Sequence, residues 1–436
     1  MTHMIIPHLV APALLLLVGN SAFQQPTTNA PAAQQPDTSV AESGRVPVPE
    51  PTERAVEYYR SGNVIWLIST AWSIILPAVI LFSGLSARIR DLAERLGKKW
   101  FVALELYLIL FLALMYLVNL PLEFYIGYIR QHAYGMSNQS LGKWLRDSIL
   151  GHAVVMVTAC LVLWIPYLLI KKSPKRWWLY ASILAVPLLF AGMMVLPTWV
   201  APLFNDFGEM KNKELEAQIQ ALADRAGIEG GRIYEVNKSI DTKAVNAYVV
   251  GFGSTKRIVL WDTLLNKLPP REILFIMGHE MGHYVLGHLV QGILVASVLI
   301  FVTLLLIHLI SRPLLRRFGR RFGFDQLSDI ASLPLLLLLV NVFSLFVMPI
   351  GLTFSRHIEH EADRFGLEIT RDNHAAAQSF VELQKENLGV PWPDWFYKLW
   401  RGSHPSEGER IDFCNEYRPW ETGQPLKYGH LFRAPK

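Results

Sequence analysis

The chain alternates between long apolar runs and shorter polar stretches. Six of the apolar runs are each close to the roughly 20 residues that a helix needs to cross a bilayer. They lie at about 64–85, 101–120, 151–170, 178–196, 288–310 and 332–354. Polar stretches follow the fourth and the sixth run, at 197–287 and 355–436. The pattern predicts a mainly α, polytopic membrane protein with one modest polar domain.

The N-terminus has a different pattern. Residues 1–22 contain a short apolar core followed by small residues, as in a signal peptide, although an uncleaved weak first span is the alternative. Residues 23–55 are rich in Gln, Pro, Thr, Ala and Ser and are predicted to form a disordered linker. We therefore expect an N-terminal membrane domain with four spans at 56–200 and a second domain, with two further spans, at 201–436.

The polar stretch 197–287 is predicted to contain both helices and strands. Residues 211–228 have helical spacing and end before Gly230-Gly231. Three short segments rich in Ile, Val and Tyr are typical of strands. They are RIYEVN (232–237), AYVVGF (247–252) and KRIVLW (256–261). A helix should begin at Pro269-Pro270, because proline is tolerated in the first helical turn.

Composition and charge argue against two classes of protein. Hydrophobic residues make up 52% of the 436 residues and charged residues only 18%, which is unlike an ordinary soluble enzyme. The net charge of +5 does not indicate nucleic-acid binding, because the basic residues lie in short clusters beside the apolar runs. The two cysteines, Cys160 and Cys414, provide neither a disulfide framework nor a cysteine-based zinc motif.

Three loops between the apolar runs are strongly basic. Given six spans, all three loops lie on the same side of the membrane, and the positive-inside rule assigns them to the cytoplasm. Their basic residues are Arg88, Arg90, Arg95, Lys98 and Lys99 in the first loop, Lys171, Lys172, Lys175 and Arg176 in the second, and Arg312, Arg316, Arg317, Arg320 and Arg321 in the third. We therefore expect the segments 197–287 and 355–436 to face outward, in a bacterial inner membrane.

The helix expected from Pro270 carries a metal-binding motif. His279 and His283 are four residues apart, so their imidazoles project from the same side of a helix and can bind one ion. Glu280 would lie beside the metal, where it can take a proton from the attacking water. This His-Glu-x-x-His pattern is typical of zinc metalloproteases. The alternative, a solvated helix face, is disfavoured because the motif lies where a polar segment becomes apolar.

His288, which follows the motif, does not fit as a third ligand. In the metzincin pattern, a glycine and a third histidine would stand where this chain has Leu286 and Leu289. His288 also lies about 140° around the helix from His283. We therefore expect His288 to be a polar residue at the membrane boundary.

The best source of a third ligand is the segment 355–369, at the polar end of the sixth apolar run. The candidates there are His357, Glu359, His360, Glu361 and Asp363. Glu359 and Asp363 share a helix face, so Glu359 could bind the metal while Asp363 accepts a hydrogen bond from a ligand imidazole. A charged, solvated helix end explains the segment equally well.

Both halves of the predicted site lie where apolar runs become polar. The helix from 270 to 310 is expected to run from the metal site directly into the bilayer, with His283 within one or two turns of the apolar run. Glu359 lies about two turns beyond Pro349-Ile350-Gly351. The site is therefore predicted at the membrane interface, which favours a membrane-bound peptide or a membrane protein as substrate.

Six sequence blocks resemble those of the type I CAAX prenyl endopeptidase family of membrane zinc proteases. The blocks are GMSNQSLGKWLRD (135–147), LPTWVAPLFNDF (196–207), NAYVVGFGSTKRIVLWDTLL (246–265), GHEMGH (278–283), SRHIEHEADRFG (355–366) and GSHPSEGERI (402–411). The resemblance extends over about 55–425. It implies a ring of membrane helices around a water-filled chamber, a small α+β protease domain of the gluzincin type, and one zinc ion per chain.

The resemblance also implies roles for individual residues. Glu359 becomes the third zinc ligand, and Asp363 becomes the group that orients a ligand histidine. Asn246 would hold the substrate backbone or the transition state, and His404 would stabilise the oxyanion. Arg410 would be a cation that supports the site.

These observations predict a zinc metalloendopeptidase that cleaves membrane-associated substrates. A zinc-binding membrane chaperone and a multi-span transporter are the alternatives. In eukaryotic members of the family the catalytic domain faces the cytosol, whereas the charge bias of this chain points outward. The sequence leaves open the physiological substrate, any need for prenylation and the oligomeric state.

Overall fold

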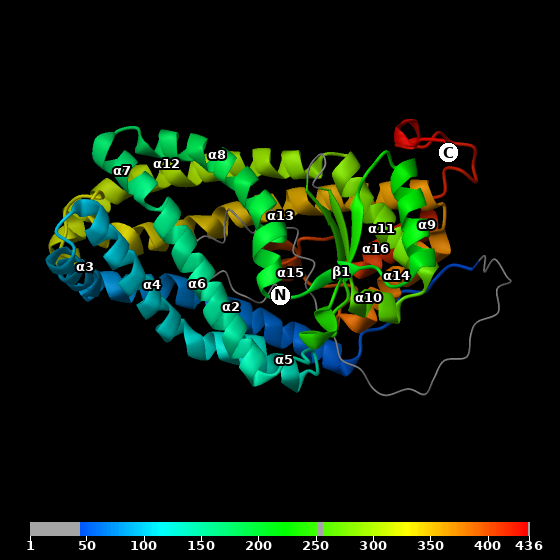
Figure 1. Ribbon diagram of the computed structural model, residues 1–436, viewed down its shortest axis with the longest axis horizontal. Coiled ribbons are helices and arrows are strands. Elements are labelled where there is room, and N and C mark those ends of the chain that lie inside the picture. The colour runs from blue at the N-terminus through cyan, green and yellow to red at the C-terminus, as the bar shows by residue number, and fades with distance from the viewer. Residues whose placement is uncertain (1–43, 252–255, 435–436) are drawn as a thin grey trace.

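The computed structural model describes residues 44–251 and 256–434 (Figure 1). The signal-like segment predicted at 1–22 lies outside the described residues, as does most of the linker predicted at 23–55. The described chain is mainly helical and contains one small sheet. The predicted mainly α fold with a small α+β portion is therefore confirmed.

Within the described residues, six helical units are long and apolar enough to cross a membrane. They are Glu53–Phe82 (α2), Trp100–Ala133 (α4, Trp100–Phe124, to α5, Arg130–Ala133), Leu141–Lys172 (α6, Leu141–Val162, and α7, Trp164–Lys172), Trp177–Leu203 (starting with α8, Trp177–Val195), His288–Phe322 (α12) and Ile330–Thr370 (mostly α13, Leu333–Thr370). Their outer faces are apolar and exposed: Leu161, Val298 and Phe346 are 68%, 61% and 72% exposed. Such faces belong in lipid, so the chain is an integral, multi-pass membrane protein.

The polar domain is built around a four-stranded sheet with the strand order β1-β2-β4-β3. The strands are β1 (Phe207–Glu209), β2 (Arg232–Val236), β3 (Ala247–Val250) and β4 (Arg257–Trp261). β2 and β4 are parallel, while β1 and β3 pair antiparallel with their neighbours. All three predicted strands are present, and the short β1 is an addition. β3 lies at an edge of the sheet.

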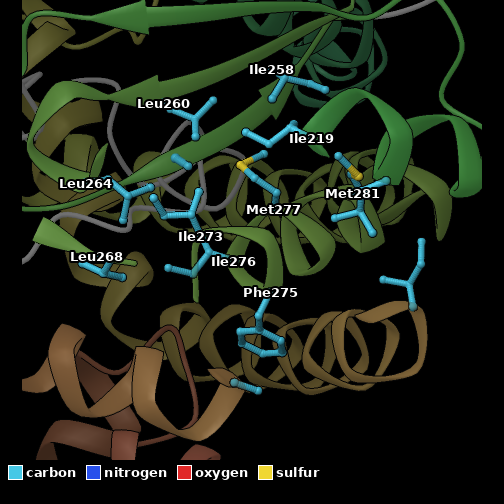
Figure 2. Close-up of a cluster of buried hydrophobic side chains, with 14 of the residues drawn as sticks. Ile219, Ile258, Leu260, Leu264, Leu268, Ile273, Phe275, Ile276, Met277 and Met281 are labelled. Atoms are coloured by element: carbon cyan, nitrogen blue, oxygen red, sulfur yellow. The ribbon is translucent and has the colours of Figure 1, made fainter. Parts of the chain in front are cut away.

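The other α-helices of the described chain are α3 (Leu85–Leu96), α9 (Lys213–Arg225), α10 (Asp262–Lys267), α11 (Pro270–Val285), α14 (Asn373–Glu386), α15 (Trp395–Trp400) and α16 (Glu407–Glu416). Of these, α11 lies at the centre of the polar domain. Met277 and Met281 of α11 are fully buried and share one hydrophobic cluster with Ile219 of α9 and Ile258 of β4, which lie on the same side of α11 (Figure 2). Phe275 points the other way and contacts Phe380 of α14. Burying a side chain of this size contributes roughly 1.5–3 kcal/mol, so α11 is held firmly on two sides.

The helix that carries the motif does not run straight into the membrane, which corrects the prediction of one helix from 270 to 310. α11 ends at Val285, Gly287 has a φ of 69°, and α12 starts at His288. Glycine adopts a positive φ readily, and this conformation commonly ends a helix. The chain therefore turns between the motif and the fifth span.

The end of the predicted disordered linker is ordered in the structure. Residues 44–52 form no helix or strand, and Val46 is buried. The Val46 backbone exchanges two hydrogen bonds of 2.9 Å with the Asn415 side chain, and Gln384 Nε2 donates to the Pro49 carbonyl at 3.0 Å. The composition of this segment suggested disorder, but α14 and α16 provide it with partners for both its backbone and its one buried side chain.

The basic loops gather at one end of the molecule, and the sheet lies at the other end (Figure 1). Contacts join the first and third of these loops: Arg90 Nη1 donates to the Gly323 carbonyl at 3.1 Å, and Arg321 Nε donates to the Phe82 carbonyl at 3.4 Å. The membrane spans thus separate the basic loops from the polar domain.

The spans and the polar domain line a partly open cavity of about 1600 Å³. Apolar side chains of the membrane helices, such as Val154 and Leu188, form much of its wall. Residues of the edge strand β3 and the motif residue Glu280 line the same cavity. The motif therefore faces an internal space that is partly apolar.

Candidate active site

Glycines allow α11 and α13 to pack in close contact. A Cβ on Gly366 would lie 3.0 Å from the backbone nitrogen of His279, and a Cβ on Gly278 would lie 3.3 Å from Cα of Gly366. Larger residues at these positions would push the two helices apart. The close approach brings Glu359 of α13 opposite His279 and His283 of α11.

His279, His283 and Glu359 form a group that could hold a metal ion. The Nε2 atoms of the two histidines are 3.1 Å apart, and they lie 3.3 and 3.4 Å from oxygens of Glu359. Ligand atoms bound at roughly 2.0–2.1 Å to a tetrahedral ion are themselves about 3.3 Å apart. Glu359 Oε2 is buried and has no hydrogen-bond partner among the described residues. The three residues therefore fit a small metal ion.

Asp363 and Arg410 support one of these residues, His279. Asp363 Oδ1 lies 2.8 Å from His279 Nδ1, and Arg410 contacts both carboxylate oxygens of Asp363, with Nη2 at 2.5 Å and Nε at 2.9 Å. Burial alone would lower the pKa of His279, but the neighbouring carboxylates of Asp363 and Glu359 outweigh burial and raise it to about 10. These carboxylates thus favour a positive charge at the His279 ring.

His288 supports the other histidine, in contrast to the expectation that it only marks the membrane boundary. Its Nδ1 atom lies 2.9 Å from His283 Nδ1, and His288 is buried. The turn at Gly287 breaks the helical spacing from which a 140° separation was expected, and it brings the two rings together. If His283 Nδ1 donates the hydrogen, its Nε2 lone pair is left for a metal.

Glu280 lies next to this group and lines the cavity. Burial raises the pKa of the Glu280 carboxyl above its ordinary value, although the neighbouring His279 and His283 act in the opposite direction. A carboxylate with a raised pKa is a better proton acceptor near neutral pH than an exposed one. Its position and chemistry suit a general base.

His404 approaches the same group from the loop between α15 and α16. Its Nε2 atom lies 3.3 Å from Glu359 Oε1, and its Nδ1 atom lies 2.8 Å from Ser403 Oγ. Because a carboxylate only accepts, the hydrogen belongs on Nε2, and Ser403 then donates to Nδ1. Burial lowers the pKa of His404, so its ring is a neutral donor at pH 7. Arg356, one turn before Glu359, holds this loop through hydrogen bonds to the Lys398 and Gly402 carbonyls.

Asn246 lies directly before the edge strand β3 and lines the cavity. Its Oδ1 atom accepts a hydrogen bond of 2.8 Å from Ala247 N, and its carbonyl accepts one of 3.0 Å from Trp261 N. The second bond fixes the start of β3 against β4. Asn246 and Glu280 therefore face one cavity from different elements.

The remaining polar candidates on α13 do not join the metal group. Glu361 forms ion pairs with Arg364 and Lys427, and His360 packs on the ring of Phe413. His357 is exposed. Of the five candidates in this segment, Glu359 and Asp363 are the two that reach the histidines of α11.

A helical membrane domain around a cavity, with two histidines and two glutamates at its polar end, defines the architecture of a membrane-embedded metalloprotease. Comparisons with known proteins agree. The family model described as peptidase family M48 matches residues 209–418. A second model, described as the CAAX prenyl protease N-terminal region with five membrane helices, matches residues 43–206.

Individual relatives lead to the same family. The chain is 39% identical to an uncharacterised metalloprotease, YhfN, of Bacillus subtilis, over 84% of this chain and 86% of that protein. It is 27% identical to the human CAAX prenyl protease 1 homologue, over 68% of this chain and 70% of that protein. The crystal structure of S. mikatae Ste24p has the same fold, with a TM-score of 0.74 at 23% identity over 84% of this chain and 88% of that chain.

The chain belongs to peptidase family M48. It is a membrane metalloendopeptidase, and the predicted helical ring around a chamber is confirmed by the fold match. The chaperone and transporter alternatives are not favoured.

Proposed function

We propose that this protein is a zinc endopeptidase that cleaves membrane-associated peptides or membrane proteins inside its cavity. The observation that carries the proposal is the group of His279, His283 and Glu359, which lies beside Glu280 at the cavity wall. One zinc ion per chain would be held by the first three side chains. When bound, zinc lowers the pKa of water and polarises a carbonyl group.

The protein side chains would transfer the proton, stabilise the oxyanion and orient a ligand histidine. Glu280 accepts a proton from the attacking water and passes it on to the leaving amine. His404 donates its Nε2 hydrogen toward the oxyanion that develops on the scissile carbonyl. Asp363 holds the Nδ1 hydrogen of His279, and Arg410 keeps the Asp363 carboxylate ionised and fixed.

The edge strand β3 suggests how a peptide is bound. Residues of β3 line the cavity, and β3 has a sheet neighbour on one side within the described residues. An extended substrate could add to this edge through backbone hydrogen bonds, which require no particular substrate sequence. Asn246, at the start of β3, would then contact the substrate backbone close to the scissile bond.

The apolar cavity wall suits a substrate that carries a lipid or a membrane segment. Several relatives are named CAAX prenyl proteases, which makes a prenylated peptide the first candidate to assay. The three basic loops favour a bacterial inner membrane with the polar domain facing outward. Reporter fusions after residues 230 and 320 test this topology: residue 230 should report outside and residue 320 inside.

The function is tested with purified protein in lipid nanodiscs. Its cleavage of a membrane-anchored peptide should stop when zinc is chelated and return when zinc is added. A parallel peptide without the lipid anchor shows whether the membrane delivers the substrate. Binding of the anchored peptide without any zinc-dependent cleavage would contradict the proposal.

A further inference from the structure

Two arginine side chains meet at the cavity wall. Arg130 stands at the start of α5, Arg401 directly follows α15, and both line the cavity that contains Glu280. They converge on Gly62 of α2. A Cβ on Gly62 would lie 3.2 Å from Arg401 Nη2 and 3.6 Å from Arg130 Nη2. Gly62 thus leaves a small space that is bordered by two guanidinium groups.

Neither guanidinium group is neutralised by an acid. Arg130 Nη2 donates to the Tyr58 carbonyl at 2.8 Å and to Ser61 Oγ at 3.1 Å, and Arg401 Nη1 donates to Asn63 Oδ1. All of these acceptors are uncharged. In the part of the chain that the structure describes, no carboxylate oxygen lies within the 4.0 Å of an ion pair from either group. Arg130 Nε is buried with no hydrogen-bond partner there.

Tyrosine rings lie over both cations, with the Tyr58 ring centroid 3.8 Å from Arg130 Cζ and the Tyr397 ring centroid 5.0 Å from Arg401 Cζ. These contacts offset part of the cost of burying the two cations, but neither ring supplies a negative charge to pair with them. Arg130 is 6% exposed, and buried charges in proteins are normally paired because desolvation is expensive. The two cations also repel each other. Burial and the nearby Arg130 charge lower the pKa of Arg401. A carboxylate would relieve both costs, since guanidinium groups bind carboxylates through pairs of parallel hydrogen bonds.

The position of the pair relative to the active site indicates which anion it binds. Arg401 is three residues before His404, and three residues of extended chain span at most about 11 Å. His404 Nε2 lies 3.3 Å from Glu359, a member of the metal group. An extended peptide with its scissile bond at Glu280 would therefore bring a group only a few residues away to Arg401.

We propose that Arg130 and Arg401 bind the C-terminal carboxylate of the substrate and so direct cleavage to a bond a few residues before its end. The inference rests on the proposed function. A phospholipid phosphate is the other anion that could reach a membrane-embedded pair. The peptide carboxylate is favoured because the pair faces the cavity that it shares with Glu280 and not the lipid-exposed faces of the spans.

The test compares two peptides that differ only in a free C-terminal carboxylate or a C-terminal amide. The wild-type protein should cleave the acid with a kcat/KM roughly 10- to 100-fold above that of the amide, as expected for a charge-assisted, bidentate contact. In Arg401→Gln the ratio should fall to about one, and Arg401→Lys should be intermediate. Arg316→Gln, which removes an exposed arginine at the far end of the fifth span, should keep the wild-type ratio.

Gly62→Asp is a second variant, which fills the site with a carboxylate where Arg401→Gln removes a cation. It places a carboxylate of the protein itself between the two arginines, so it should abolish the preference for the acid while raising the melting temperature. Peptide binding to Glu280→Gln, measured by calorimetry, gives a readout that is independent of catalysis. The acid should bind roughly tenfold or more tightly than the amide.

Equal treatment of acid and amide by the wild-type protein, in both cleavage and binding, would overturn the inference while leaving the proposed protease function intact. A phospholipid that copurifies with the wild-type protein and is lost from Arg401→Gln, with no change in the acid-to-amide ratio, would overturn it in favour of lipid. If the wild type cleaves neither peptide, the protease proposal fails, and the binding preference of Glu280→Gln still decides the arginine site.

Discussion

The Nδ1 atom of His279 lies 2.8 Å from Oδ1 of Asp363, one helical turn beyond Glu359 on α13. Because a carboxylate accepts and does not donate, the Nδ1 position must carry the hydrogen when the ring is neutral. The Nε2 lone pair then points to Glu359 and His283. One carboxylate of α13 thus faces the Nε2 atoms of the two histidines, and the next one contacts His279 on the opposite side of its ring.

Asp363→Asn should weaken zinc binding while leaving the fold in place. The amide can still fill the space, but it loses the negative charge that strengthens His279 as a ligand and pairs with Arg410. Affinity should fall roughly 10- to 100-fold, measured by competition with a chelator. Asp412→Asn, which alters a more exposed ion pair with Arg45, should keep the wild-type affinity. An unchanged affinity in Asp363→Asn would refute the assigned role.

The spacing between α11 and α13 should be as important as the ligands. In Gly366→Ala the new Cβ would meet the backbone of His279 at 3.0 Å and force the helices apart. We expect a loss of about 1–3 kcal/mol in stability together with weaker zinc binding, measured by thermal unfolding and zinc titration. Gly142→Ala, where a Cβ meets nothing within 4 Å, should be close to neutral in both. If the two variants behave alike, close helix packing does not position Glu359.

His404 should affect the chemical step and leave the metal in place. His404→Gln should lower kcat roughly 100- to 1000-fold with normal zinc content, because a donor to the oxyanion is lost or displaced. Ser403→Ala should cause a smaller loss, since the hydroxyl only fixes which ring nitrogen carries the hydrogen. His357→Gln changes an exposed histidine of the same site region and is the matched control. A rise in KM at constant kcat would instead indicate a role in substrate binding.

An ionic cluster that joins α6 to the polar domain should make stability depend on pH. Asp241 lies 2.7 Å from Lys143 Nζ and accepts a hydrogen bond of 2.6 Å from Asn205. Burial alone would raise the pKa of Asp241, but Asn205, Lys143 and Lys238 outweigh burial and lower it below 3.8. The ionised carboxylate therefore stabilises the protein above pH 3.8, and this contribution is lost as the pH falls through the lowered folded-state pKa.

Asp241→Asn should accordingly destabilise the protein by about 3 kcal/mol at neutral pH, because two lysines lose a buried partner. The difference from wild type should shrink as the pH falls below 3.8 and through the lowered folded-state pKa of Asp241, as measured by thermal unfolding. Glu209→Gln removes an exposed pair with Lys213 and should change stability little at either pH. A difference that persists in acid would show that Asp241 does not act through its charge.

The helices, the strands and the candidate metal-site residues that follow from local pattern could be predicted from the sequence. The spans were predictable from the length of the apolar runs. The pairing of His279 with His283 was predictable from their spacing of four residues on a helix. Glu359 needed the resemblance, because on residues alone a solvated helix end explained its segment equally well. Glu359 reaches the two histidines because α13 packs against α11, which lies about 80 residues earlier in the sequence. Gly366 makes this close packing possible.

The features that were missed depend on backbone turns and on distant contacts. The contact of His288 with His283 could have been suspected from Gly287, a residue that commonly ends a helix. The convergence of Arg130 and Arg401 has no such local signal, because three separate elements of the fold bring them to Gly62. Residues 44–52 were assigned to disorder for the same reason: their partners lie more than 300 residues away.

The most direct test of the central claim is Glu280→Gln, with zinc content and proteolysis measured on the same preparation. The substitution removes the proposed proton acceptor and leaves the three candidate metal-binding side chains in place. The account predicts about one zinc ion per chain in both proteins and a loss of at least about 100-fold in cleavage by the variant. A variant that retains zinc and also cleaves at the wild-type rate would contradict the account.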